Sequence, residues 1–237
     1  MDDILIIEST VSHDSLEDDA YDVIKHVKPE WSRTDVQFKH VCDIIFHFSH
    51  FRFQALFPGG VSQLQSDWQY IETALSKTKS PVVFCHNDLL LGNIIYDETE
   101  DKVTFIDYEY AGVNYQAFDI ANHFDEFAGV SPIDHSRYPG PEFQLSWLRT
   151  YLEEYTGSPP SPHQLATLHW QVQQFSPVAH CFWTIWGLVQ AEHSDIEFDF
   201  FQYASSTYQG YVLKRDKYLG TSPPSPQVIP PSPPPAS

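Results

Sequence analysis

Residues 84–96 read Phe84-Cys85-His86-Asn87-Asp88-Leu89-Leu90-Leu91-Gly92-Asn93-Ile94-Ile95-Tyr96, and Thr104-Phe105-Ile106-Asp107-Tyr108-Glu109-Tyr110 follows after a short polar stretch. This part of the chain decides the fold. It places His86, Asp88 and Asn93 in one polar loop and a further carboxylate, Asp107, after the next apolar run. Polar side chains that could take part in catalysis or metal binding therefore lie where the strand-like runs end.

The apolar runs around these residues are short and rich in β-branched and aromatic side chains, which is typical of strands. We expect strands at 82–85, 93–96 and 103–106, and the polar residues 97–101 predict a hairpin loop between the last two. Pairing those two strands brings Asn93 and Asp107 to the same end of a ribbon. One cation could then bridge them.

The spacing His-x-Asp-x-x-x-x-Asn, followed by a later Asp, is that of a kinase catalytic loop and its metal-binding carboxylate. Phosphoryl transfer needs one carboxylate to orient the attacking hydroxyl, here Asp88. It also needs an amide and a second carboxylate, here Asn93 and Asp107, to hold Mg²⁺ against the triphosphate. Each residue alone would more often be an ordinary loop residue, but the joint spacing with His86 favours the catalytic interpretation.

The composition predicts a folded, acidic protein. The 237 residues are 42% hydrophobic and 15% aromatic, and the formal net charge is -19. This charge disfavours nucleic acid and anionic membrane surfaces as partners and favours a small cationic substrate. Cys42, Cys85 and Cys181 lie far apart without metal-type spacing, and no apolar stretch is long enough for a membrane span. We expect a soluble, cytoplasmic protein.

Apolar residues at helical spacing predict a mostly helical chain around the hairpin. We expect helical segments in the regions 16–27, 64–75, 115–127, 148–155 and 196–219. Ser161-Pro162-His163-Gln164 predicts the start of a long helical region that reaches Ala191, with an interruption at Pro177. The Pro- and Ser-rich residues 221–237 are expected to be disordered.

With these residues in place, the chain resembles the choline/ethanolamine kinase family. Beyond the segments quoted above, the resemblance rests on residues 105–112, 118–124, 182–191 and 196–200. It spans roughly residues 62–219 and implies an α+β fold, a eukaryotic-kinase-like carboxyl-terminal lobe that is mostly helical with a small β-hairpin carrying the catalytic loop. Leu89-Leu90 after Asp88 is similar to ethanolamine kinases, whereas choline kinases usually show Cys-Gln there.

The resemblance implies roles for individual residues. Asp88 would orient and deprotonate the hydroxyl of ethanolamine, and His86 would hold the catalytic loop in place. Asn93 and Asp107 would ligate the Mg²⁺ that accompanies ATP. Asp119 would stabilise the loop without touching the substrate.

The amine pocket can also be argued physically. An ammonium ion needs aromatic faces and a carboxylate to offset its desolvation. Trp183 and Trp186 are three residues apart and share a helix face, although taken alone both would more often be core aromatics, and Glu126 a surface charge. In the family that the chain resembles, residues matching this pair, Tyr110, Glu126 and Tyr203 line the site for the substrate cation.

The chain departs from the family before His86. That part contains no G-x-G-x-x-G motif, and its only glycines are Gly59 and Gly60. By comparison with the family, we therefore expect this sequence to lack most of the amino-terminal nucleotide-binding lobe. We expect a remnant segment at 1–61, the kinase-like lobe at 62–219 and a disordered tail at 220–237.

The predicted function is ATP-dependent phosphorylation of ethanolamine to phosphoethanolamine, the first step of the CDP-ethanolamine route to phosphatidylethanolamine. Two alternatives stay open. The first is a catalytically impaired isoform that binds the amine or regulates a full-length kinase, as a dimer with itself or with that homologue. The second is a kinase for choline or another small amino alcohol.

Overall fold

The computed structural model describes residues 60–225. The amphipathic helix expected at 16–27 and nearly all of the expected remnant segment 1–61 lie outside the described residues. So do residues 226–237 of the expected tail. Thr221–Ser225, the described start of that tail, has no regular secondary structure.

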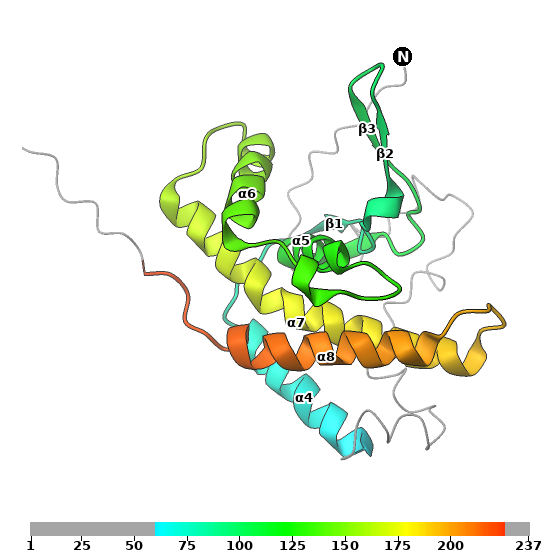
Figure 1. Cartoon of the computed structure of the whole chain (residues 1–237). Coiled ribbons are helices and arrows are strands. Elements are labelled where there is room, and N and C mark those ends of the chain that lie inside the picture. The colour runs from blue at the N-terminus through cyan, green and yellow to red at the C-terminus, as the bar shows by residue number, and fades with distance from the viewer. Residues whose placement is uncertain (1–59, 226–237) are drawn as a thin grey trace, which may run out of the picture.

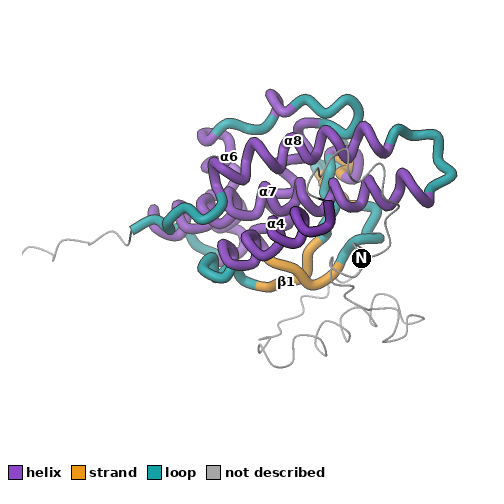
Figure 2. The backbone as a smooth tube through the Cα atoms, turned by 90° about the horizontal axis from the view of Figure 1, so that it is seen from below, coloured by secondary structure: helices purple, strands orange, loops and turns teal. Residues whose placement is uncertain are grey.

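The body is built on two long helices, α7 (Pro162–His193) and α8 (Phe200–Tyr218), which lie side by side along most of their length (Figures 1 and 2). The predicted start of α7 is confirmed. The Ser161 hydroxyl accepts a hydrogen bond from the backbone N–H of Gln164 at 3.2 Å, and the Gln164 side chain accepts from the backbone N–H of Ser161 at 2.9 Å. This reciprocal pair satisfies amides that the first helical turn leaves free.

The interruption expected at Pro177 was wrong, because α7 continues through it. A proline removes one helical hydrogen bond and crowds the preceding turn. Pro177 is buried in the part of α7 that packs against α5 and α8. Burial on both sides therefore offsets the local cost, which the sequence pattern alone does not reveal.

The remaining helices pack around this pair. Helix α4 (Gly60–Leu75) and helix α5 (Gln116–Asp125) both contact α7, as does α6 (Pro141–Thr156), which ends at Gly157 with a left-handed φ of 68°. Short 3₁₀ turns occupy Leu91–Asn93, Glu126–Ala128 and His135–Arg137. The shared core includes the fully buried side chains of Ile71, Phe124, Leu148, Phe175, Ile185 and Tyr211.

Two small antiparallel sheets complete the fold. Strands β2 (Ile94–Asp97) and β3 (Lys102–Phe105) form the predicted hairpin, which projects away from the helices (Figure 1). Strand β1 (Val82–Cys85) pairs with β4 (Gly112–Tyr115), a strand that the sequence did not predict. Gly and Asn are disfavoured in strands, and β4 exists because it pairs with a segment almost thirty residues earlier. The predicted α+β architecture is confirmed.

Within residues 60–225, no helix combines the length and the apolar character that crossing a bilayer requires.

Candidate functional site

The hairpin brings Asn93 and Asp107 to one end, as predicted. Ile94 pairs with Phe105, and the next backbone bond runs from the N–H of Ile106 to the carbonyl of Asn93 at 3.0 Å. Asp107 is therefore the first residue beyond the paired part of the ribbon. The loop 86–93, which is the predicted catalytic loop, enters the hairpin at this same end (Figure 1).

Helix α5 holds the first residues of that loop through Asp119. Its two carboxylate oxygens accept hydrogen bonds from consecutive backbone amides, from His86 at 2.9 Å and from Asn87 at 2.7 Å. A carboxylate that accepts two backbone N–H groups is a strong, directional anchor. These two hydrogen bonds hold the start of the loop, in line with the loop-stabilising role expected for Asp119.

Asn87 is a site-building residue that the sequence reasoning missed. Its backbone adopts φ 65°, a left-handed conformation that Asn tolerates better than most residues. Its side-chain nitrogen donates to the carbonyl of Tyr110 at 2.9 Å, and its side-chain oxygen accepts from Asn114 at 2.9 Å. Its carbonyl accepts from Asn122 at 3.1 Å. Asn87 thus ties the loop to both β4 and α5.

Two histidines fasten the loop further along. Nε2 of His86 lies 2.9 Å from the carbonyl oxygen of Ile106, which links the loop to the residue between β3 and Asp107. Nδ1 of His123, on α5, lies 2.8 Å from the carbonyl oxygen of Leu89. Both histidines therefore connect the loop to other parts of the fold, and the role of His86 in the site stays a prediction. The sequence analysis did not single out His123.

Asp88 is buried, with 8% of its surface exposed. The Asn93 side-chain nitrogen donates to its backbone carbonyl at 2.9 Å and lies 3.4 Å from its carboxylate oxygen Oδ2. Burial raises the pKa of the Asp88 carboxyl to about 6, and the nearby charges of Asp107 and Glu109 add to this, while His86 opposes it. A carboxyl group with such a pKa can accept a proton near neutral pH.

Asn93 and Asp107 have the chemistry of magnesium ligands. The Asn93 nitrogen is engaged with Asp88, so Oδ1 is the atom left for a cation. Asp107 is exposed, has a left-handed φ of 64°, and pairs with no basic side chain within residues 60–225. The described residues hold no cluster of three or more His, Cys, Asp or Glu side chains suited to a metal. Mg²⁺ often uses only one or two protein ligands and takes the others from phosphates and water, so the pair fits.

Four aromatic side chains from three parts of the chain meet beside this loop, and we call them the aromatic box: Tyr110, Trp183, Trp186 and Tyr203. The rings of Trp183 and Trp186 cross at 80° with centroids 5.4 Å apart. Tyr203 packs against Trp186 at 5.8 Å and Tyr110 against Trp183 at 5.6 Å. The indole N–H of Trp186 donates to the Tyr110 hydroxyl at 3.0 Å. Such perpendicular packing holds each ring in one orientation.

Trp183 connects the box with the loop 86–93. It is 6% exposed, and its indole N–H donates to the Asn122 side-chain oxygen at 2.7 Å. Asn122 in turn donates to the Asn87 carbonyl. Trp183 is therefore a core residue as well as a wall of the box, whereas Trp186 is only half-buried.

Glu126 supplies a carboxyl group to the same region. It is half-buried at the end of α5, and burial raises its pKa to about 8, with further upward contributions from the charges of Asp88 and Asp125. The charges of Glu126 and Asp88 both contribute to raising the pKa of Tyr203, although burial is the larger cause. Glu126, Tyr203 and the Asp88 carboxyl group thus share one electrostatic environment.

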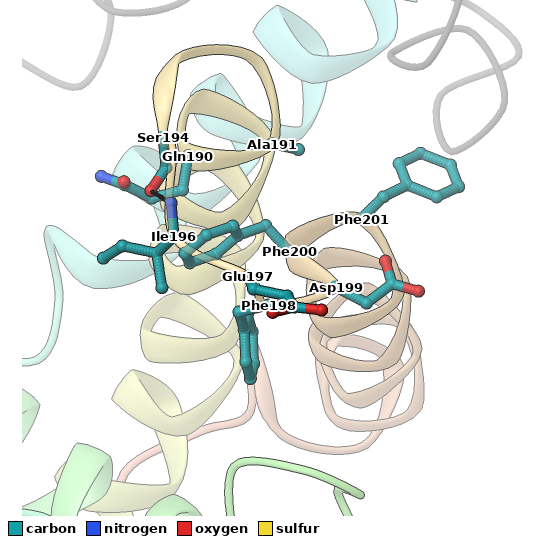
Figure 3. Close-up of a pocket in the computed structure, with 9 residues that line it drawn as sticks. All are labelled: Gln190, Ala191, Ser194, Ile196, Glu197, Phe198, Asp199, Phe200 and Phe201. Carbon is teal, nitrogen blue, oxygen red and sulfur yellow. Dashed lines mark hydrogen bonds between the residues drawn. The ribbon is translucent and has the colours of Figure 1, made fainter.

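A hollow of about 550 Å³ lies at the turn between α7 and α8, next to the box (Figure 3). It is lined by residues of the α7 end and the α8 start, among them Glu197, Phe198, Asp199 and Phe200. Phe200 packs against Trp186 at 5.6 Å and Phe198 against Tyr203 at 6.0 Å. The outer wall of the box is therefore part of an open, acidic and aromatic depression.

Comparison with solved structures identifies the class of fold. A Plasmodium vivax ethanolamine kinase superposes with a TM-score of 0.60 at 25% identity, covering 90% of this chain and 52% of that one. A choline kinase from Cryptosporidium parvum superposes with a TM-score of 0.53 at 21% identity, covering 90% of this chain and 60% of that one. The fold is thus the kinase-like fold of these small-molecule kinases.

Sequence comparison gives the family. The family model described as choline/ethanolamine kinase matches residues 24–212, and the chain belongs to this family. It is 52% identical over 151 residues to ethanolamine kinase 2 of Mus musculus. That alignment covers 64% of this chain and 39% of the mouse protein, so the chain spans about two fifths of the length of this relative.

Proposed function

We propose that the chain carries the catalytic loop and the amine site of an ethanolamine kinase, which transfers the γ-phosphoryl group of ATP to the hydroxyl of ethanolamine. One observation carries this proposal. Trp183 of the aromatic box donates to Asn122, and Asn122 donates to the carbonyl of Asn87, the residue directly before Asp88. Asp88 also raises the pKa values of Glu126 and Tyr203, although burial is the larger cause for both. A small amino alcohol could therefore place its ammonium group in the box and its hydroxyl at Asp88.

In this proposal the carboxylate of Asp88 accepts the hydroxyl proton as the oxygen attacks the γ-phosphorus. The bond between that phosphorus and the oxygen that bridges it to the β-phosphate breaks, and ADP leaves with the electron pair. Asn93 and Asp107 would hold Mg²⁺, which supplies positive charge against the phosphate oxygens. Asp119, Asn122 and His123 keep the loop rigid, since positioning contributes much of the rate in such transfers.

The ammonium group would lie against the faces of Trp186 and Tyr203, with Glu126 as its counter-charge. Cation–π contacts contribute about 0.5–1 kcal/mol at exposed sites and about 2 kcal/mol or more with desolvated rings, and a carboxylate adds the counter-charge that a desolvated ammonium ion needs. The half-buried position of Trp186 beside an open hollow gives a route for a ligand. The names of relatives of this chain favour ethanolamine over choline as the substrate.

The test is phosphoethanolamine formation by the purified full chain with Mg²⁺-ATP and ethanolamine, monitored by ³¹P NMR. We expect turnover that disappears when Mg²⁺ is chelated and that is at least 100-fold lower in Asp88→Asn. Amine binding should persist in that variant, because the box is untouched. Choline in place of ethanolamine tests the substrate choice.

A second candidate function is binding of the amine without turnover. It is favoured by the lack of a G-x-G-x-x-G motif before His86, because kinases use such a loop to cover the phosphates. In that case the full chain binds ethanolamine, measured by calorimetry, with no product in the same preparation.

We further propose that the phosphoethanolamine formed by an active chain enters the CDP-ethanolamine route, that the protein acts in the cytoplasm, and that it pairs with itself or with a full-length homologue.

A further inference from the structure

Gly187 is an unusual residue for its position. It lies inside α7, next to Trp186, and it is buried. Glycine in a helix interior costs roughly 0.5–1 kcal/mol relative to alanine because it loses more conformational freedom on folding. A glycine there is best explained by a contact that leaves no room for a side chain.

The contact is made by the first turns of α8. A Cβ atom at Gly187 would lie 3.0 Å from Cδ1 of Tyr203, 3.1 Å from Cβ of Ala204 and 3.2 Å from the carbonyl oxygen of Phe200. All three distances are shorter than ordinary carbon contacts, and one of them is to backbone. An alanine at this position would therefore push the start of α8 outward by a few tenths of an ångström.

That part of α8 forms the outer wall of the aromatic box. The rings of Phe200 and Tyr203 pack against Trp186 at 5.6 Å and 5.8 Å, both nearly perpendicular to it. Figure 3 shows Phe200 reaching from the start of α8 toward α7. The distance between α7 and α8 at Gly187 thus sets how closely Tyr203 approaches Trp186.

We propose that Gly187 is the positioning residue that sets the width of the aromatic box and thereby selects small ammonium groups over trimethylated ones. This inference rests on the proposed function, because it takes the box to be the amine site. A primary ammonium ion is smaller than a trimethylammonium group, so only closely spaced rings and a nearby carboxylate can contact it from several sides at once. A wider box loses contacts with the primary amine and admits the larger trimethylammonium group.

The test is the ratio of the dissociation constants of choline and ethanolamine for the full chain, measured by quenching of tryptophan fluorescence. We expect the wild-type chain to bind ethanolamine more tightly. Gly187→Ala should shift the ratio toward choline by roughly tenfold, the scale of one methyl-sized change in a pocket. Gly187→Ala combined with Ala204→Gly, which frees space at the same contact, should move the ratio back toward that of the wild type.

Gly210→Ala is the matched control. A Cβ at Gly210 would meet the rings of His180 and His135 at 2.7–2.8 Å, so this change disturbs the same helix pair at residues that are not part of the aromatic box. Its ratio should equal that of the wild type. A folded Gly187→Ala variant with an unchanged ratio, or an equal shift in Gly210→Ala, would overturn the inference. A folded wild-type chain that binds neither amine would instead overturn the proposed function on which the inference rests.

Discussion

Asp88 is buried beside two other carboxylates, and its pKa of about 6 has a direct consequence for catalysis. The group must be ionised to accept a proton, and below pH 6 it is mostly protonated. We expect the rate of phosphoethanolamine formation at low ethanolamine concentration to rise from pH 5 to pH 7, with an apparent pKa near 6. A profile that is flat over this range, as for an ordinary aspartate, would contradict the assignment.

The raised pKa of Glu126 leads to a second prediction, which concerns proton release on amine binding. Because its pKa lies at about 8 without a ligand, the group is largely protonated at pH 7. An ammonium ion beside it favours the carboxylate, so amine binding should release a proton. Calorimetry in two buffers with different ionisation enthalpies measures this release at pH 7. In Glu126→Gln the buffer dependence should vanish and binding should weaken; buffer-independent heats in the wild type would refute the role of Glu126.

At the residue scale, the sequence predicted the groups that follow a fixed local spacing. Asp88, Asn93 and Asp107 were predicted because their order along the chain is itself the signal. The structure brings Asn93 and Asp107 to one end of the hairpin, and the Asn93 side chain contacts Asp88. Asn87 and Asn122 were missed. Their hydrogen bonds join segments about thirty residues apart. The sequence alone does not distinguish an asparagine that makes such long-range bonds from one in an ordinary loop.

Among the elements, α5 matters most to the site because it carries Asp119. Asp119→Asn preserves the shape of the side chain but turns one acceptor into a donor that faces a backbone N–H. We expect at least tenfold lower turnover with little change in ethanolamine affinity, and faster hydrogen exchange at the amides of His86 and Asn87. Glu153→Gln on the exposed face of α6 is the control. Unchanged exchange at the two amides would show that α5 does not hold the loop.

The helices and strands show which parts of the fold a local sequence pattern can predict and which it cannot. The hairpin β2–β3 and the start of α7 follow from turn and capping residues that lie close together in sequence. Strand β4 and the continuity of α7 through Pro177 depend on packing between distant segments. Periodicity cannot report such contacts, so both were beyond the reach of the sequence alone.

At the scale of the whole molecule, a buried ion pair joins helices α5 and α8. Lys214 donates to Asp125, which also accepts from Ser176 of α7 at 2.8 Å, and the Lys214 ammonium lies 3.5 Å from the centre of the Tyr138 ring. Asp125 directly precedes Glu126, so this network fixes the end of α5 at the proposed amine site.

Removing one partner of this pair leaves a buried charge without compensation. We expect Lys214→Met to lower the free energy of unfolding by about 3–5 kcal/mol, measured by urea denaturation. Adding Asp125→Asn should recover part of the loss. Lys217→Met, at an exposed position of the same helix, should change stability by less than about 0.5 kcal/mol. Equal effects of the two lysine changes would mean that the pair does not stabilise the fold.

The central claim is that Asp88 joins an amine site to a magnesium and phosphate site in this chain. The most direct test compares the wild-type chain with Asp88→Asn in one ³¹P NMR assay with Mg²⁺-ATP and ethanolamine, with ethanolamine binding measured on the same samples. We expect both proteins to bind the amine and only the wild type to form phosphoethanolamine. Equal product formation by the two proteins, or a folded wild type that forms none, would contradict it.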